Sequence, residues 1–144
     1  MLPMTEIALT LEHLATLRRV AEDAFPNECC GLLVGSGAPT ITIQELVPVA
    51  NVAAQSEARF EVDPQAQFDL LRRLRGSGLR IVGHYHSHPN GVAELSRQDL
   101  AMANDPAAVW LLVPVRASEA GAPRAYVCPT PERAEPIGII EVSP

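Results

Sequence analysis

Three of the four histidines in this 144-residue sequence fall at alternate positions, His84, His86 and His88. An extended segment turns alternate side chains to one side, so two of these imidazoles can reach one metal ion. Asp99 follows on the next expected element and can add an oxygen ligand, leaving the fourth tetrahedral position of zinc for water. Bound zinc lowers the pKa of a water to about 7 and polarises a carbonyl oxygen. The pattern therefore predicts a metal-assisted amide hydrolase.

The spacing of these residues is more specific than a lone pair of histidines. Seven residues separate His88 of HSHP from Ser96, and two residues separate Ser96 from Asp99. This arrangement resembles the HxHx7SxxD motif of the JAMM (MPN-plus) metalloprotease family. Upstream, PNECCGLLVG resembles the family's segment around its catalytic glutamate, which maps onto Glu28. The resemblance covers nearly the whole chain, and five functional positions are filled in the family's order.

The resemblance implies a role for each matching residue. It implies one zinc ion per chain held by His86, His88 and Asp99, a general base and acid at Glu28, and a transition-state donor at Ser96. Glu28 comes just before an apolar stretch, where burial can raise a carboxylate's pKa and suit it to proton transfer. The hydroxyl of Ser96 can offer its proton to the oxyanion that forms on the carbonyl.

Simpler interpretations exist for several of these residues. Ser96 followed by Asp99 is also the pattern of a helix capping box, which is compatible with catalysis because a capping oxygen accepts a bond while its proton stays available. His84 could instead complete a three-histidine site, in which Asp99 would contact a ligand and not the metal itself. Packing or hydrogen bonding of His84 near the site is favoured. Glu28 on its own would be interpreted as a surface acid. Trp110, alone in an apolar stretch, is expected in the core.

The elements that must position these residues follow from hydrophobic periodicity and turn signals. Strands and helices alternate irregularly, which predicts an α/β (α+β) fold with a mixed sheet flanked by helices. The resemblance implies the family's deaminase-like MPN fold, with a mostly antiparallel sheet. Asp63 and Pro64 open one helix as N-cap and first helical residue, and the glycines at 76 and 78 close it. The other expected helices are 11–24 and 96–104, and the expected strands are 7–9, 30–35, 40–49, 59–62, 79–85, 109–115, 126–128 and 137–142.

Composition limits the classes of protein that remain. The 47% hydrophobic content and the length suit a single domain over residues 1–144. Apolar stretches are too short to span a membrane and the N-terminus lacks a secretory pattern, so we expect a cytoplasmic protein. Three cysteines without a paired-cysteine metal motif suit a reducing compartment. A net charge of −6 disfavours nucleic acid as a partner.

The predicted function is a zinc isopeptidase or peptidase. The resemblance implies cleavage of an amide after the C-terminal Gly-Gly tail of a ubiquitin-like or sulfur-carrier protein. Such a tail could add to a sheet edge, and its glycines could pass close to the metal. The alternatives are a peptidase acting on small peptides or cell-wall fragments, a non-catalytic MPN scaffold module, and a DNA-repair-associated relative, which the acidic charge disfavours. The sequence does not assign an oligomeric state, the carrier's identity or the leaving group.

Overall fold

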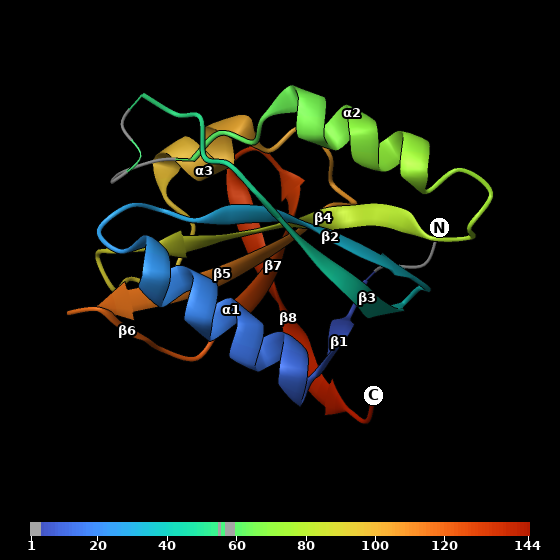
Figure 1. Ribbon diagram of the computed structural model, residues 1–144, viewed down its shortest axis with the longest axis horizontal. Helices are drawn as coiled ribbons and strands as arrows, with labels where there is room; N and C mark the ends of the chain where they lie inside the picture. Colours follow the sequence, from blue (N-terminus) through green and yellow to red (C-terminus); the bar gives the residue numbers. More distant parts are fainter. Residues whose placement is uncertain (1–3, 55, 57–59) are drawn as a thin grey trace.

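The computed structural model describes residues 4–54, 56 and 60–144, which form a sheet with three helices packed around it (Figure 1). The helices are α1 (Leu11–Ala24), α2 (Pro64–Arg73) and α3 (Arg97–Met102). The strands are β1 (Glu6–Thr10), β2 (Cys30–Ser36), β3 (Thr40–Val49), β4 (Arg80–His88), β5 (Val109–Arg116), β6 (Glu119–Ala120), β7 (Arg124–Thr130) and β8 (Arg133–Val142).

The sheet has the strand order β4-β2-β3-β1-β8-β7-β5-β6, and β4 also pairs with β5. Because of that extra pairing, the strands from β4 round to β5 form a closed ring, and β6 extends it beside β5. The β1–β3, β1–β8 and β4–β5 pairs are parallel and the other described pairs are antiparallel. The predicted mixed, mostly antiparallel sheet is confirmed, whereas its closure was not predicted.

The two faces of β4 serve different purposes because alternate side chains of a strand point to opposite sides. Tyr85 belongs to the main hydrophobic core, which also contains Leu17 and Ala21 of α1. The opposite face of the sheet carries two smaller clusters, one around Trp110 and one in which Leu70 of α2 packs. Helix α1 therefore covers one face, while α2 and α3 lie on the other (Figure 1).

The starts of the helices agree with their predicted caps. Asp63 caps α2 by accepting from the Gln65 N–H, with Pro64 at the first helical position, and Ser96 caps α3. Helix α2 ends at Arg73, and its chain turns at Gly76 and Gly78, whose positive φ angles of 74° and 79° favour glycine.

Several predicted boundaries were wrong. The expected strand at 59–62 is not formed by its described residues, because Val62 makes only an isolated bridge with Asn51 and residue 59 lies outside the described part. Helix α3 ends at Met102 and not near 104. Strand β4 continues past Tyr85 to His88, so all three histidines lie on it. Strands β7 and β8 are longer than expected, and β6 was not predicted.

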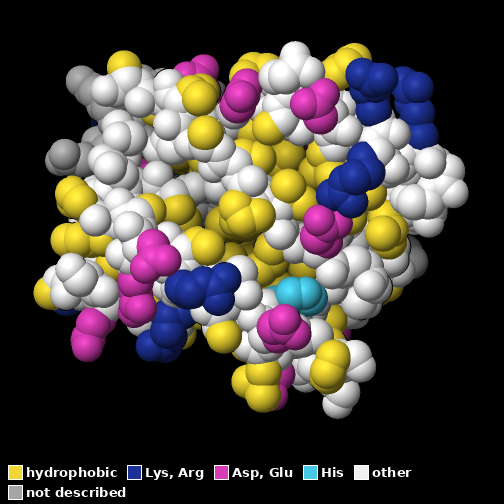
Figure 2. Space-filling view, viewed as in Figure 1, with side chains coloured by type: hydrophobic (Ala, Val, Ile, Leu, Met, Phe, Trp, Pro, Cys, Tyr) yellow, Lys and Arg dark blue, Asp and Glu magenta, His cyan; other side chains and the backbone are white. Residues whose placement is uncertain are grey.

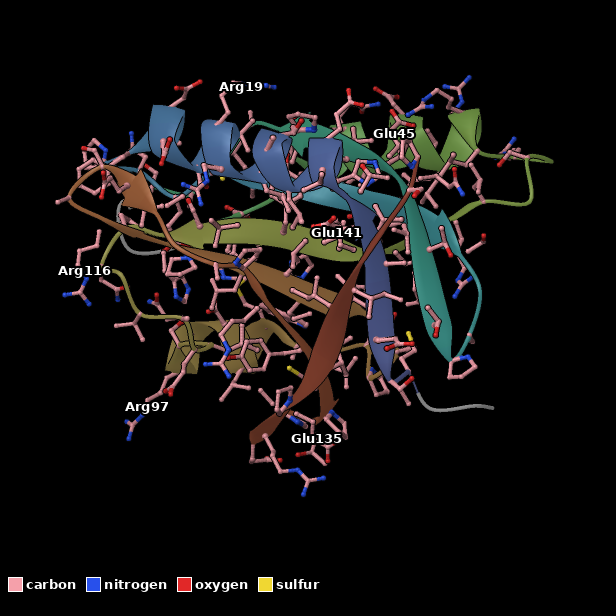
Figure 3. All side chains as sticks on the ribbon, turned by 90° about the horizontal axis from the view of Figure 1, so that it is seen from below. Arg19, Glu45, Arg97, Arg116, Glu135 and Glu141 are labelled. Atoms are coloured by element: carbon pink, nitrogen blue, oxygen red, sulfur yellow. The ribbon has the colours of Figure 1, made fainter. Side chains whose placement is uncertain are left out.

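Charged and hydrophobic side chains are distributed unevenly over the surface. The labelled charged side chains, such as Arg19 and Glu135, point outward from the ribbon (Figure 3). Hydrophobic side chains gather in a hollow at the centre of one face, between α1 and α2 (Figure 2). Among the described residues, we find no helix both long and apolar enough to cross a membrane.

Candidate functional site

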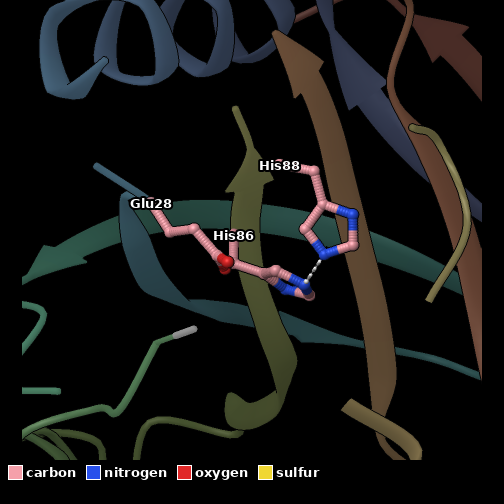
Figure 4. A group of neighbouring side chains, drawn as sticks. All are labelled: Glu28, His86 and His88. Carbon is pink, nitrogen blue, oxygen red and sulfur yellow. Dashed lines mark hydrogen bonds between the residues drawn. The ribbon is translucent and has the colours of Figure 1, made fainter. Parts of the chain in front are cut away.

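Two buried histidines at the end of β4 face each other. The Nε2 atoms of His86 and His88 are 3.2 Å apart (Figure 4). His88 Nδ1 lies 3.0 Å from the Val92 carbonyl oxygen, to which it can only donate, so Nε2 is the nitrogen that faces the site. Burial lowers the pKa of His86. Burial also opposes charge on His88, but the hydrogen bond and charge of Asp99 outweigh it and raise the pKa of His88.

The Asp99 carboxylate completes this group from the first turn of α3. Its Oδ2 atom lies 3.1 Å from His88 Nε2 and 3.4 Å from His86 Nε2. Burial would raise the pKa of Asp99, but the hydrogen bonds with the two histidines hold it well below its usual range. Asp99 is therefore an anion next to two imidazoles, although its side chain is almost fully buried.

Glu28 approaches the same histidines from the segment before β2. Its carboxylate and the ring nitrogens of His86 and His88 all lie within 4.8 Å of one another (Figure 4). The Glu28 backbone is held on both sides, since its N–H donates to the Ser56 carbonyl at 2.6 Å and its carbonyl accepts from the Asn51 amide at 2.9 Å.

The environment of the Glu28 carboxyl group favours its protonated form. Glu28 is 4% exposed, and its Oε1 has no hydrogen-bond partner within the described part of the chain. Burial raises its pKa to about 7, with His88 lowering it and Asp99 raising it further. A carboxyl group with this pKa can both accept and release a proton near neutral pH.

Ser96 forms the capping box that its sequence pattern indicated. Its Oγ accepts from the Asp99 N–H at 3.1 Å, while the Ser96 N–H donates to Asp99 Oδ2 at 2.9 Å. The hydroxyl proton of Ser96 is not used in this box and can be donated elsewhere. The same Asp99 oxygen thus caps α3 and faces both histidines.

His84 lies beside the site and not in it. Its ring centroid is 6.0 Å from that of His86. The ring packs edge-on against Trp110 at 4.3 Å and lies tilted against Phe60 at 5.3 Å. Burial lowers the pKa of His84 to about 3, so the ring is neutral. Among the described residues, the possible metal-binding group contains Glu28, His86 and His88 without His84. This is the packing role favoured for His84 from the sequence.

The donor set fits a metal ion. Two imidazole nitrogens and a carboxylate oxygen lie within 3.4 Å of one another, with a second carboxylate nearby. Histidine nitrogen and carboxylate oxygen are ligands that zinc accepts in open catalytic sites. The second ring nitrogen of His88 is held by a backbone carbonyl, as is usual for metal-binding histidines.

Sequence reasoning missed three residues that support the site. The Phe60 ring stacks on the His86 ring at 4.2 Å. Asn51 holds the Glu28 carbonyl, and the Tyr126 hydroxyl donates at 2.5 Å to the Ala93 carbonyl in the segment that follows His88. These contacts join segments distant along the chain, and no local motif marks them.

Comparisons with known proteins give a consistent result. The family described as prokaryotic homologs of the JAB domain matches residues 10–128. A desampylase from Haloferax volcanii is 39% identical over 88 residues, which are 60% of this chain and 62% of the relative. A probable TtuB-protein conjugate cleaving protease from Thermus thermophilus is 32% identical over 54% of this chain and 50% of the relative. A CysO-cysteine peptidase from Mycobacterium tuberculosis is 29% identical over 81% of this chain and 79% of the relative.

The matched segment thus spans about three fifths and one half of the first two relatives. Solved structures show the same fold. A protein from Desulfitobacterium hafniense matches with a TM-score of 0.83 and 26% identity over 96% of this chain and 94% of that chain. A JAB1/MPN domain protein from Archaeoglobus fulgidus matches with a TM-score of 0.59 and 20% identity over 96% of this chain and 98% of that chain.

Proposed function

This chain belongs to the family of prokaryotic homologs of the JAB domain, and we propose that it is a zinc-dependent amide hydrolase. Its substrate is a ubiquitin-like or sulfur-carrier protein, and the bond that it cleaves follows the carrier's C-terminal Gly-Gly. The observation that carries the proposal is the convergence of Glu28, His86, His88 and Asp99 in one buried group.

In this proposal, His86, His88 and Asp99 hold one zinc ion. Their donor atoms already lie within 3.4 Å of one another, so little rearrangement is needed to surround an ion. Zinc, when bound, supplies Lewis-acid activation of the scissile carbonyl and of the attacking water. We assign Glu28 to proton transfer because its carboxyl group is adjacent to these ligands and has a pKa near neutrality.

Two side chains of this protein then act on the substrate. The Glu28 carboxylate takes a proton from the attacking water and delivers it to the nitrogen of the leaving amine. The Ser96 hydroxyl donates a hydrogen bond to the oxygen of the carbonyl as negative charge develops there. The capping bond from the Asp99 N–H orients Ser96 Oγ without using its proton.

The substrate class is supported by the relatives. Their names describe a desampylase, a conjugate cleaving protease and a CysO-cysteine peptidase. Two terminal glycines would let a protein tail approach a buried metal without a side-chain clash. The tail cannot extend the sheet beside the histidines, because β4 is already paired with β2 and β5. We propose that the tail instead crosses the C-terminal end of β4, next to α3.

Metal analysis and a cleavage assay on the same samples test this function. The parent should bind one zinc ion per chain and cleave a carrier protein joined through Gly-Gly to a lysine side chain or an amino acid. His88→Ala and Asp99→Ala should each lose most of the zinc and the activity. His13→Ala, which removes a histidine that only caps α1, should keep both.

Two results would contradict the proposal. Full zinc occupancy in Asp99→Ala would show that Asp99 is not a required ligand and that Glu28 or His84 completes the site with His86 and His88. Equal cleavage of tails with and without the two glycines would indicate a general peptidase, since replacing either glycine by a bulky residue should lower kcat/KM sharply.

A further inference from the structure

A pocket of about 480 Å³ lies between α2 and α3 on the face of the sheet that carries the histidines. We name it the α2–α3 pocket. Its floor is formed by β4 and β5 through residues 81–84 and Trp110, and its sides by the segment 60–62, α2 and the residues that end α3. Helices α2 and α3 lie on the same side of the sheet (Figure 1), and residues of both contribute to the lining of the pocket.

The α2–α3 pocket shares its walls with the metal centre. Phe60 lines it and stacks on the His86 ring at 4.2 Å. His84 also lines it, with its ring centroid 6.0 Å from that of His86. An extended chain advances about 3.3 Å per residue, so this separation corresponds to roughly two residues. A side chain two or three residues from the scissile bond can therefore reach the pocket.

The lining has an apolar interior and an acidic mouth. Leu32, Val62 and Ile81 contribute apolar surface, whereas the exposed Glu61 and Asp105 contribute carboxylates. None of the described residues that line the pocket is a lysine or an arginine. This combination is complementary to a long aliphatic side chain that ends in a cation.

We propose that the α2–α3 pocket binds a lysine or arginine side chain of the carrier tail, at the residue preceding its two terminal glycines. This inference rests on the proposed function. The glycines have no side chains, so the residue before them is the first that can fill a pocket at this distance. The tail is also the part that all conjugates of one carrier share, whereas the acceptor varies, so a preformed pocket serves every conjugate only if it binds the tail.

Cleavage of matched substrates tests the pocket. Carrier tails ending in Lys-Gly-Gly, Ala-Gly-Gly and Glu-Gly-Gly are joined to the same leaving group, and kcat/KM is compared. We expect Lys-Gly-Gly to exceed Glu-Gly-Gly about tenfold, since two exposed carboxylates attract one side chain and repel the other. Glu61→Lys should reduce or invert this preference. Glu132→Lys, an equal charge change at an exposed site outside the pocket, should preserve it.

A binding measurement tests the same contact without catalysis. Trp110 is the only tryptophan of the chain and lies in the floor of the pocket, so its fluorescence reports occupancy. At constant zinc, a peptide ending in Lys-Gly-Gly should change the emission at lower concentration than one ending in Glu-Gly-Gly. If all three tails are cleaved with equal kcat/KM, or if only the acceptor's charge matters, the pocket assignment is wrong while the proposed function stands. If none of the three tails is cleaved, the proposed function is wrong, and the pocket assignment that rests on it is wrong as well.

Discussion

One oxygen atom of the Asp99 carboxylate contacts both the N-cap of α3 and the two histidines. Its Oδ2 accepts the Ser96 N–H and also faces both histidines. The sequence could not separate a capping acid from a ligand, because both require an acid three residues after Ser96. The two roles of this acid can be distinguished only in the folded protein, where the end of β4 lies beside α3. The capping bond fixes the carboxylate before any metal binds, which lowers the entropy lost on coordination.

Removal of the Glu28 carboxylate should separate metal binding from chemistry. We predict that Glu28→Gln keeps zinc but lowers kcat by a factor of about 100 or more, because the amide cannot accept the proton of the attacking water. Glu94→Gln, an exposed glutamate in the segment after His88, is the matched control and should turn over at the parent rate. Parent-like turnover in Glu28→Gln with zinc bound would place the base elsewhere.

The same carboxyl group should affect stability in the metal-free protein. Its folded pKa is about 7 against an ordinary value of 4.5, so between these pH values the folded state holds a proton that the unfolded state has released. The free energy of unfolding should therefore fall as pH rises from 4.5 to 7. We predict that Glu28→Gln removes this decrease in the free energy of unfolding between pH 4.5 and 7, as measured by urea titrations at a series of pH values. Identical pH profiles for both proteins would show that Glu28 titrates normally.

At the level of elements, the segment between β4 and α3 connects two parts of the site. The Val92 carbonyl accepts from His88, and the neighbouring Ala93 carbonyl accepts from the Tyr126 hydroxyl of β7. Tyr126 is buried and packs in the cluster of Trp110 and Phe60. Strand β7 thus holds the segment that orients a proposed zinc ligand.

We predict that Tyr126→Phe weakens zinc binding about threefold to tenfold, because contacts behind a metal ligand usually change affinity to this degree or more. Zinc affinity is measured by competition with a chelator, together with the melting temperature of the metal-free protein. Tyr85→Phe is the control, since the buried Tyr85 hydroxyl has no partner among the described residues. A lowered melting temperature with unchanged zinc affinity would leave Tyr126 a purely structural role.

Elements with local signals could be predicted from the sequence, and those without could not. Asp63 and Ser96 carry capping side chains, so the starts of α2 and α3 were placed correctly. Residues 60–62 alternate as a strand would, but in the described part of the chain Val62 forms only an isolated bridge, with Asn51. The motif placed Glu28, Ser96 and Asp99 near the histidines. The stacking of Phe60 and the α2–α3 pocket depend on contacts between distant segments, which periodicity does not encode.

At the scale of the whole molecule, closure of the sheet keeps the histidine strand between two partners. The β4–β5 pairing runs from Gly83 and Val109 to His88 and Pro114. The backbones approach so closely that a Cβ at Gly83 would collide with the Val109 carbonyl oxygen. Gly83 is therefore required by the closure, and it also lines the α2–α3 pocket.

We predict that Gly83→Ala lowers the free energy of unfolding of the metal-free protein by about 1–3 kcal/mol, because β4 must move away from β5. Gly138→Ala in β8 is the matched control, since a Cβ there meets only an ordinary contact at 3.4 Å with Glu6 Cβ. Hydrogen exchange should show faster amide exchange along β4 and β5 in Gly83→Ala, and zinc affinity should fall as His86 and His88 lose their register. Equal stability of the two variants would mean that the ring tolerates a side chain at its closure, so that β5 does not fix the position of the histidines.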